Sequence, residues 1–143
     1  MAKRTVINSF EIKFPSRSVN EGFARVITSA FAAQVDPTIE VLSEIKTAVS
    51  EAVTNAVVHG YVNTTGMISI KMQLFDDKKL RITVKDRGVG IGDISKAMEP
   101  LYTTGSEDRA GMGFTIMETF MDKLRVKSVE GKGTTVVMEK SLT

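Results

Sequence analysis

Residues 51–61 read EAVTNAVVHGY and belong to a long run rich in Ala and Val. Apolar residues recur through this run at helical spacing, which predicts a buried helix. Glu51, Asn55 and His59 recur every fourth residue beside the apolar stripe. A spacing of four turns about 40° around a helix, so the three polar side chains form a ribbon along one edge of a core helix.

This ribbon has two interpretations. A solvent-exposed edge explains any two of its members, and His59 could equally cap or pack the helix. An exposed edge favours strong helix formers, however, and Asn and His are poor ones. Asn supplies a neutral carbonyl oxygen suited to a hard cation such as Mg2+, and Glu can accept a proton from a nucleophile. We therefore expect Glu51 and Asn55 to form one wall of a site.

The composition is that of an ordinary globular protein. The 143 residues suit one domain, residues 1–143, with 42% apolar and 25% charged residues. With 19 basic and 17 acidic side chains, the net charge of +2 does not indicate a nucleic-acid or membrane partner. The chain has no Cys, which excludes disulfides and thiolate zinc sites. No signal peptide or membrane span is recognisable, so we expect a cytoplasmic location.

The predicted elements follow the order β-α-α-β-β-α-β-β. They are a strand through 10–14, a helix through 23–31, a helix from Thr38 to Gly60, a hairpin of 67–75 and 80–85, a short helical piece at 94–98, a helix opening at Gly111, and a hairpin of 125–129 and 134–142. Residues 101–111 lack periodicity, which predicts a mobile segment. Grouped strands and helices indicate an α+β sandwich with helices on one face of the sheet.

A second polar feature is DRGVGIGD at 86–93, directly after a predicted strand. Gly88 and Gly90 allow close approach of the backbone to a ligand. Asp86, at the strand end, could accept a hydrogen bond from an exocyclic amine such as that of adenine. A plain turn is the alternative. The dinucleotide fingerprint fits poorly, because the third glycine falls at the wrong spacing and no long helix follows.

The third feature is Gly111-Met112-Gly113, which opens a helix. N–H groups at a helix N-terminus favour phosphate, and Arg109 stands two residues earlier. The alternative is a flexible loop that ends in glycines; a Walker A loop is excluded, because no GK[ST] follows. Together with the aperiodic segment 101–111, the three features supply a metal ligand, a base-recognition group, a lid and a phosphate site, in an order that indicates a Mg-ATP pocket.

These motifs resemble those of the GHKL ATPase/kinase superfamily. Glu51–Gly60 is similar to the N box, Asp86–Gly90 to the G1 box, Gly111–Gly113 to the G2 box, and Gly133-Thr134 to the terminal Gly-Thr element near the adenine. The resemblance implies a two-layer Bergerat sandwich, with a mixed, mostly antiparallel sheet and helices on one face.

One branch is more similar still. VNEGFARV (19–26), the stretch 34–61 and EPLYTTGSEDRAGMGFTIMETFMD (99–122) strongly resemble the sporulation anti-sigma F factors, and the likeness extends over about residues 8–140. This family implies a homodimeric protein-serine kinase. Such a kinase holds sigma factor F inactive and phosphorylates a serine of an anti-anti-sigma partner, without contacting nucleic acid or membrane.

The resemblance also implies roles for individual residues. Glu51 corresponds to the general base, Arg109 to the lid arginine near the γ-phosphate, and Asn55 to the Mg2+ ligand. Asp86 corresponds to the adenine-recognising carboxylate. The nucleotide-binding residues implied are Asn55, Asp86, Gly88, Gly90, Thr103, Thr104, Gly111, Met112, Gly113 and Thr134.

Glu21 and Arg25 correspond to the surface pair that contacts both the sigma factor and the anti-anti-sigma partner. The chain departs from the family pattern in a slightly longer N-terminus. It also has Gly105 in the lid where a charged residue is usual, which leaves the ordering of the lid open.

Three hypotheses for the function follow. The chain has one His, inside the N box, so a phosphoacceptor must lie on another molecule; the length leaves no room for the transducer domains of gyrase or MutL. The first hypothesis is a serine kinase that also binds sigma factor F. The second is a general-stress anti-sigma kinase with a different sigma factor, and the third is a nucleotide-gated binding module without kinase activity.

Overall fold

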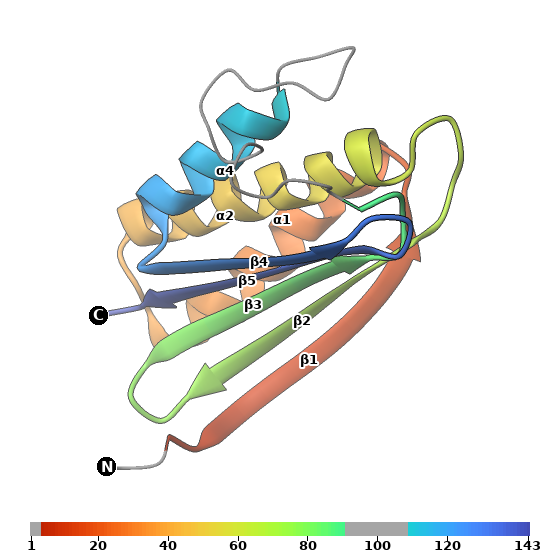
Figure 1. Ribbon diagram of the computed structural model, residues 1–143. Coiled ribbons are helices and arrows are strands. Elements are labelled where there is room, and N and C mark those ends of the chain that lie inside the picture. The colour runs from red at the N-terminus through yellow and green to blue at the C-terminus, as the bar shows by residue number, and fades with distance from the viewer. Residues whose placement is uncertain (1–3, 91–108) are drawn as a thin grey trace.

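The computed structural model describes residues 4–90 and 109–143 (Figure 1). Their elements are β1 (Val6–Pro15), α1 (Val19–Ala32), the 3-10 turn η1 (Ala33–Val35), α2 (Ile39–Asn55), the π-helical turn η2 (Ala56–Gly60), β2 (Met67–Phe75), β3 (Lys79–Asp86), α4 (Arg109–Phe120), β4 (Lys123–Val129) and β5 (Gly133–Ser141). This order confirms the predicted succession of strands and helices. The short helical piece expected at 94–98 and the segment 101–108 lie outside the described residues.

The strands form one five-stranded sheet in the order β1-β2-β3-β5-β4. Each of its four strand pairs is antiparallel, so in the described part of the chain the sheet is antiparallel throughout rather than mixed. Both predicted hairpins, β2–β3 and β4–β5, are confirmed. The α+β sandwich is confirmed as well, since Figure 1 shows α1, α2 and α4 on the same side of the sheet.

Alternation along the strands explains why the helices cover this face. In β2, Ile68, Ile70, Met72 and Leu74 are buried while the residues between them are more exposed. The buried set packs against the apolar stripe of α2, where Ile45, Ala48, Val49, Ala52 and Val53 recur at helical spacing. The core therefore lies between the helices and one sheet face.

The start of α2 is fixed by a side-chain cap. Thr38 has an extended backbone, and its hydroxyl oxygen accepts a hydrogen bond from the N–H of Val41 at 3.1 Å. This is the N-cap expected for a Thr that precedes a helix, and it confirms the sequence prediction. Among the described helices, none is long and apolar enough to cross a membrane.

Candidate functional site

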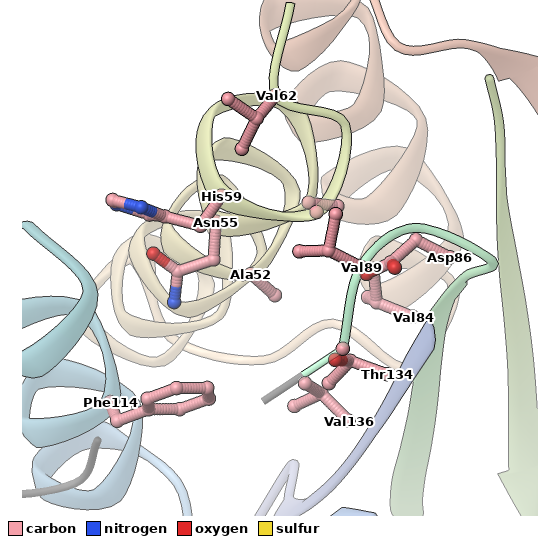
Figure 2. Close-up of a pocket in the computed structure, with 13 residues that line it drawn as sticks. Ala52, Asn55, His59, Val62, Val84, Asp86, Val89, Phe114, Thr134 and Val136 are labelled. Atoms are coloured by element: carbon pink, nitrogen blue, oxygen red, sulfur yellow. The ribbon is translucent and has the colours of Figure 1, made fainter. Parts of the chain in front are cut away.

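A pocket of about 170 Å3 opens between α2, α4 and the ends of β3 and β5 (Figure 2). Its walls combine an apolar lining with a few polar groups. It is lined by Ala52, Asn55, Ala56, His59, Gly60, Val62, Val84, Asp86, Val89, Gly90, Phe114, Thr134 and Val136. An apolar cavity with a few convergent polar groups is the usual form of a site for a small molecule.

One wall is the polar ribbon of α2. Figure 2 shows the side chains of Asn55, at the end of α2, and His59, in the following turn η2, projecting on the side that faces α4. Both polar atoms of the Asn55 amide are buried, and neither has a hydrogen-bond partner within residues 4–90 and 109–143. Buried polar groups are nearly always paired, so this amide is a candidate ligand contact.

Glu51 lies one turn before Asn55, and both face Gly113 of α4. A Cβ atom on Gly113 would lie 3.1 Å from Glu51 Oε2, 3.0 Å from Asn55 Nδ2 and 3.2 Å from Asn55 Oδ1. The absence of a side chain at Gly113 therefore lets α4 approach the two polar groups of α2. This contact brings Glu51 and Asn55 of α2 next to the Gly-x-Gly motif of α4.

The last turn of the predicted helix is π-helical rather than α-helical. It runs over Ala56–Gly60, and the N–H of Tyr61 donates to the carbonyl oxygen of Ala56, five residues earlier, at 3.1 Å. Gly60 ends it as predicted. Single π turns occur frequently at functional sites, and this one places His59 and Gly60 on the lining of the pocket.

The opposite wall is built around Asp86, at the end of β3. Asp86 is 7% exposed, and its Oδ1 accepts a hydrogen bond from the N–H of Gly88 at 2.9 Å. Burial raises the pKa of the Asp86 carboxyl above its ordinary value, while the backbone N–H groups of Gly88 and Thr134 oppose this shift. A carboxylate held by two backbone donors in an apolar pocket is suited to accept from a ligand amine.

Two glycines let the loop after Asp86 close onto its neighbours. A Cβ atom at Gly88 would lie 1.9 Å from the carbonyl oxygen of Gly60, and Gly60 accepts a hydrogen bond from the N–H of Val89 at 2.8 Å. Gly90 has a φ of +75°, and a Cβ there would lie 2.2 Å from the Val129 carbonyl oxygen. The loop is thus fixed against η2 on one side and the β4–β5 hairpin on the other.

Thr134 lies opposite Asp86 in the β3–β5 register and lines the same pocket. Its hydroxyl is 2.8 Å from that of Ser128. The apolar part of the lining is not among the residues predicted from the sequence. Val84 and Val136 could have been found, since they stand two residues from Asp86 and Thr134 and so share their sheet face. Phe114, which is 1% exposed, follows the Gly-x-Gly motif directly.

Helix α4 begins at Arg109, two residues earlier than predicted. Gly111 therefore lies in the first turn, where N–H groups have no intrahelical partner, and Gly113 lies further inside the helix. Met112 is 41% exposed and does not line the pocket. Of the remaining expected nucleotide ligands, Thr103 and Thr104 lie outside the described residues, and so does the lid position Gly105.

Glu21 and Arg25 lie on α1, outside the pocket. Arg25 Nε is 3.3 Å from Glu21 Oε2, and the Arg25 side chain is 50% exposed. Glu21 also accepts a hydrogen bond from the hydroxyl of Ser50, which is the residue before Glu51 on α2. The predicted surface pair is therefore tied to the helix that forms the pocket wall.

Comparison with known proteins identifies the family. The family model of the histidine kinase-like ATPase domain matches residues 14–140. An anti-sigma F factor of Caldanaerobacter subterraneus is 58% identical over 134 residues, which are 93% of each chain. The anti-sigma F factor of Clostridium acetobutylicum is 52% identical over the same share of both chains.

Solved structures show the same fold. A structure of the RsbU and RsbW domains of a Mycobacterium tuberculosis protein matches 94% of this chain and 32% of its own, with a TM-score of 0.70 and 22% identity. The histidine kinase domain of the Erythrobacter litoralis blue-light activated kinase matches 85% of this chain and 61% of its own, with a TM-score of 0.58 and 20% identity. By sequence and by fold, the chain belongs to the anti-sigma F factor family of histidine kinase-like ATPase domains.

Proposed function

We propose that this single domain, residues 1–143, is a cytoplasmic, homodimeric anti-sigma factor. It binds and inhibits sigma factor F, and it uses Mg-ATP to phosphorylate a serine of an anti-anti-sigma protein. The observation that carries the proposal is the buried Asn55 amide, which finds no hydrogen-bond partner in the described part of the chain. It lines an apolar pocket that also holds Asp86, and Glu51 lies one turn earlier on α2.

The pocket supports adenine recognition at Asp86. Its ionised carboxylate accepts from the exocyclic amine, and the N–H groups of Gly88 and Thr134 hold it in place. The apolar lining, including Val84, Val136 and Phe114, covers the faces of the base. The first turn of α4, with Gly111, receives phosphate oxygens through its unpaired N–H groups.

The residues also fit a magnesium ion. The buried carbonyl oxygen of Asn55 is a hard, neutral ligand, and Mg2+ commonly takes one or two protein ligands beside phosphates and water. When bound, the ion neutralises charge on the phosphates of ATP.

Glu51 is the general base in this proposal. The serine hydroxyl of the partner attacks the γ-phosphorus, its proton passes to the Glu51 carboxylate, and the bond from the γ-phosphorus to the bridging oxygen breaks to release ADP. Arg109, at the start of α4, stabilises charge that develops on the transferred group. Glu21 and Arg25 dock the partner and the sigma factor on α1.

The test is transfer of labelled γ-phosphate from Mg-ATP to the serine of the anti-anti-sigma protein of the same organism. We expect transfer to fall at least about 100-fold in Glu51→Gln, because general base catalysis contributes that much or more, while ATP binding is kept. Glu118→Gln is the matched control, since Glu118 is exposed on α4 and does not line the pocket. Normal transfer by Glu51→Gln removes Glu51 from the base role. If the parent protein binds ATP but transfers no phosphate, the result favours the nucleotide-gated binding module without kinase activity.

A further inference from the structure

The sheet face that the helices leave uncovered is strongly basic. Strand alternation turns the buried residues towards the helices and the intervening residues outward. The charged side chains on the outward face are Arg4, Lys13, Lys71, Lys79, Arg81, Lys85, Lys123, Arg125 and Lys127, with Glu11 and Glu139 as the acidic ones. Nine positive and two negative groups give these positions a net charge of +7, against +2 for the whole chain, and Asp76 and Asp77 in the turn beside Arg4 add two negative charges at one end of the face.

Two of these cations are engaged within the face. Glu139 lies 3.1 Å from Arg4 and 2.9 Å from Arg81. The same two guanidinium groups cover the ring of Phe75, at 4.2 Å and 5.0 Å from its centre. The other seven cations are exposed, and none of them forms an ion pair with any residue in 4–90 or 109–143.

The seven cations are arranged in rows. Lys123, Arg125 and Lys127 alternate along the edge strand β4, about 7 Å from one to the next. Across the sheet, the register places Lys127, Lys85 and Lys13 in one line, separated by the small residues Thr135 and Ser69. Neighbouring cations of this line are two strands apart, or about 10 Å.

Beside the edge row the face is hollowed. Arg4, Arg81, Lys123, Leu124, Arg125, Val137 and Glu139 line a depression of about 510 Å3. Its single acidic group, Glu139, is already engaged by two arginines. An anion in the depression would therefore meet Lys123 and Arg125 without displacing an existing ion pair among the described residues.

The chemistry of this face favours duplex DNA over other polyanions. Protein partners are anchored by aromatic and apolar side chains in the middle of an interface, and single-stranded nucleic acid is held by stacking on aromatic rings. Between the cations of this face lie Ser, Thr and Val side chains, and the ring of Phe75 is covered by Arg4 and Arg81. Between these cations, the described residues of the face therefore offer neither a large apolar anchor nor an open aromatic ring. A duplex presents its phosphates outward at one charge per about 1.7 Å of axis, so cations alone suffice to bind it.

We propose that the outward face of the sheet is a sequence-independent binding surface for duplex DNA, centred on Lys123, Arg125 and Lys127 of β4. The surface contacts phosphates and carries no group that reads bases. This proposal goes beyond the kinase site, which opens on the other side of the sheet, and does not depend on it. It also revises the expectation drawn from net charge, because the total of +2 conceals an uneven distribution.

The test measures fluorescence anisotropy of a labelled 20-base-pair duplex at several salt concentrations. The full chain should bind with a dissociation constant of about 10−4–10−6 M near physiological salt and a log–log salt slope steeper than about −3. The triple variant Lys123→Gln, Arg125→Gln, Lys127→Gln should bind at least about tenfold more weakly, with the slope reduced by about 2 to 3.

The matched control is the triple variant Arg17→Gln, Lys46→Gln, Lys78→Gln. Like the test variant, it removes two lysines and one arginine, but from exposed positions outside the outward face. It should bind the duplex as the parent does. Glu11→Gln adds an independent arm that removes one negative charge from the face and should tighten binding several-fold. Equal loss in both triple variants, absent duplex binding, or binding only to phosphatidylglycerol vesicles overturns the proposal.

Discussion

Asp86→Asn should reduce ATP affinity by roughly 10- to 150-fold. In the parent, the Asp86 carboxylate accepts hydrogen bonds from the backbone N–H groups of Gly88 and Thr134, and it has lone pairs left for the adenine amine. The amide of the Asp86→Asn variant would have only one acceptor oxygen. Its NH2 group would face either a backbone N–H group or the adenine amine, and both of these are donors. A hydrogen bond to a charged group contributes about 1.5–3 kcal/mol, which gives this range of dissociation constants. Isothermal titration calorimetry of Mg-ATP binding measures it directly.

The same substitution has a signature in the pH dependence of stability. Burial raises the pKa of Asp86 above its ordinary value of 3.8. At pH values between 3.8 and this raised pKa, the folded protein therefore binds more protons than the unfolded chain. The free energy of unfolding of the parent, minus that of Asp86→Asn, should therefore fall as pH rises through this window and then level off. Chemical denaturation of the nucleotide-free proteins at several pH values provides the comparison.

Asp36→Asn is the matched control, since Asp36 is exposed at the end of η1 and its left-handed backbone suits Asn. It should leave ATP affinity unchanged. Unaltered ATP affinity of Asp86→Asn would remove Asp86 from the adenine-binding role. A stability difference that rises with pH would contradict the burial argument.

Three further substitutions test other parts of the structure. Gly88→Ala should lower the free energy of unfolding by about 1–3 kcal/mol or more, because its Cβ would lie 1.9 Å from the Gly60 carbonyl oxygen; an unchanged urea midpoint would refute this contact. Gly113→Ala should reduce phosphotransfer by about tenfold or more by displacing Asn55, while the helix propensity of Ala preserves stability; full transfer activity would show that the close approach of α4 is dispensable. Arg25→Glu should abolish sigma-factor capture without changing ATP affinity, since Arg25 is exposed on α1 and lies outside the pocket; normal capture in a pull-down would exclude this surface.

Much of the fold could be predicted because local patterns and packing agree. Thr38 could be recognised as a cap, since a hydroxyl residue before an apolar helical stripe supplies a bond that the backbone needs. The alternation of Ile68, Ile70 and Met72 fixed which face of β2 is buried. The polar ribbon through Asn55 predicted a site because Asn has a low helix propensity and so destabilises a helix unless its side chain has another role.

Other features lack a local signal. The π turn at Ala56–Gly60 differs from an α turn by one hydrogen-bond step, and the apolar pattern is nearly the same for both. The start of α4 at Arg109 follows a polar segment that has no periodicity. The basic sheet face depends on the register of five strands, which total charge cannot reveal. These properties arise from tertiary pairing rather than from sequence windows.

The hydrogen bond between Glu21 and Ser50 has a consequence for regulation. It joins helix α1, which carries Arg25, to the turn of α2 that carries Glu51, and so adds a polar link to the packing of the two helices. Thermodynamic linkage makes any such coupling reciprocal. The factor by which bound nucleotide changes the affinity for a protein docked on α1 must equal the factor by which that protein changes the affinity for nucleotide. The Ser50 hydroxyl is thus one position where a substitution would test whether the two equilibria are coupled.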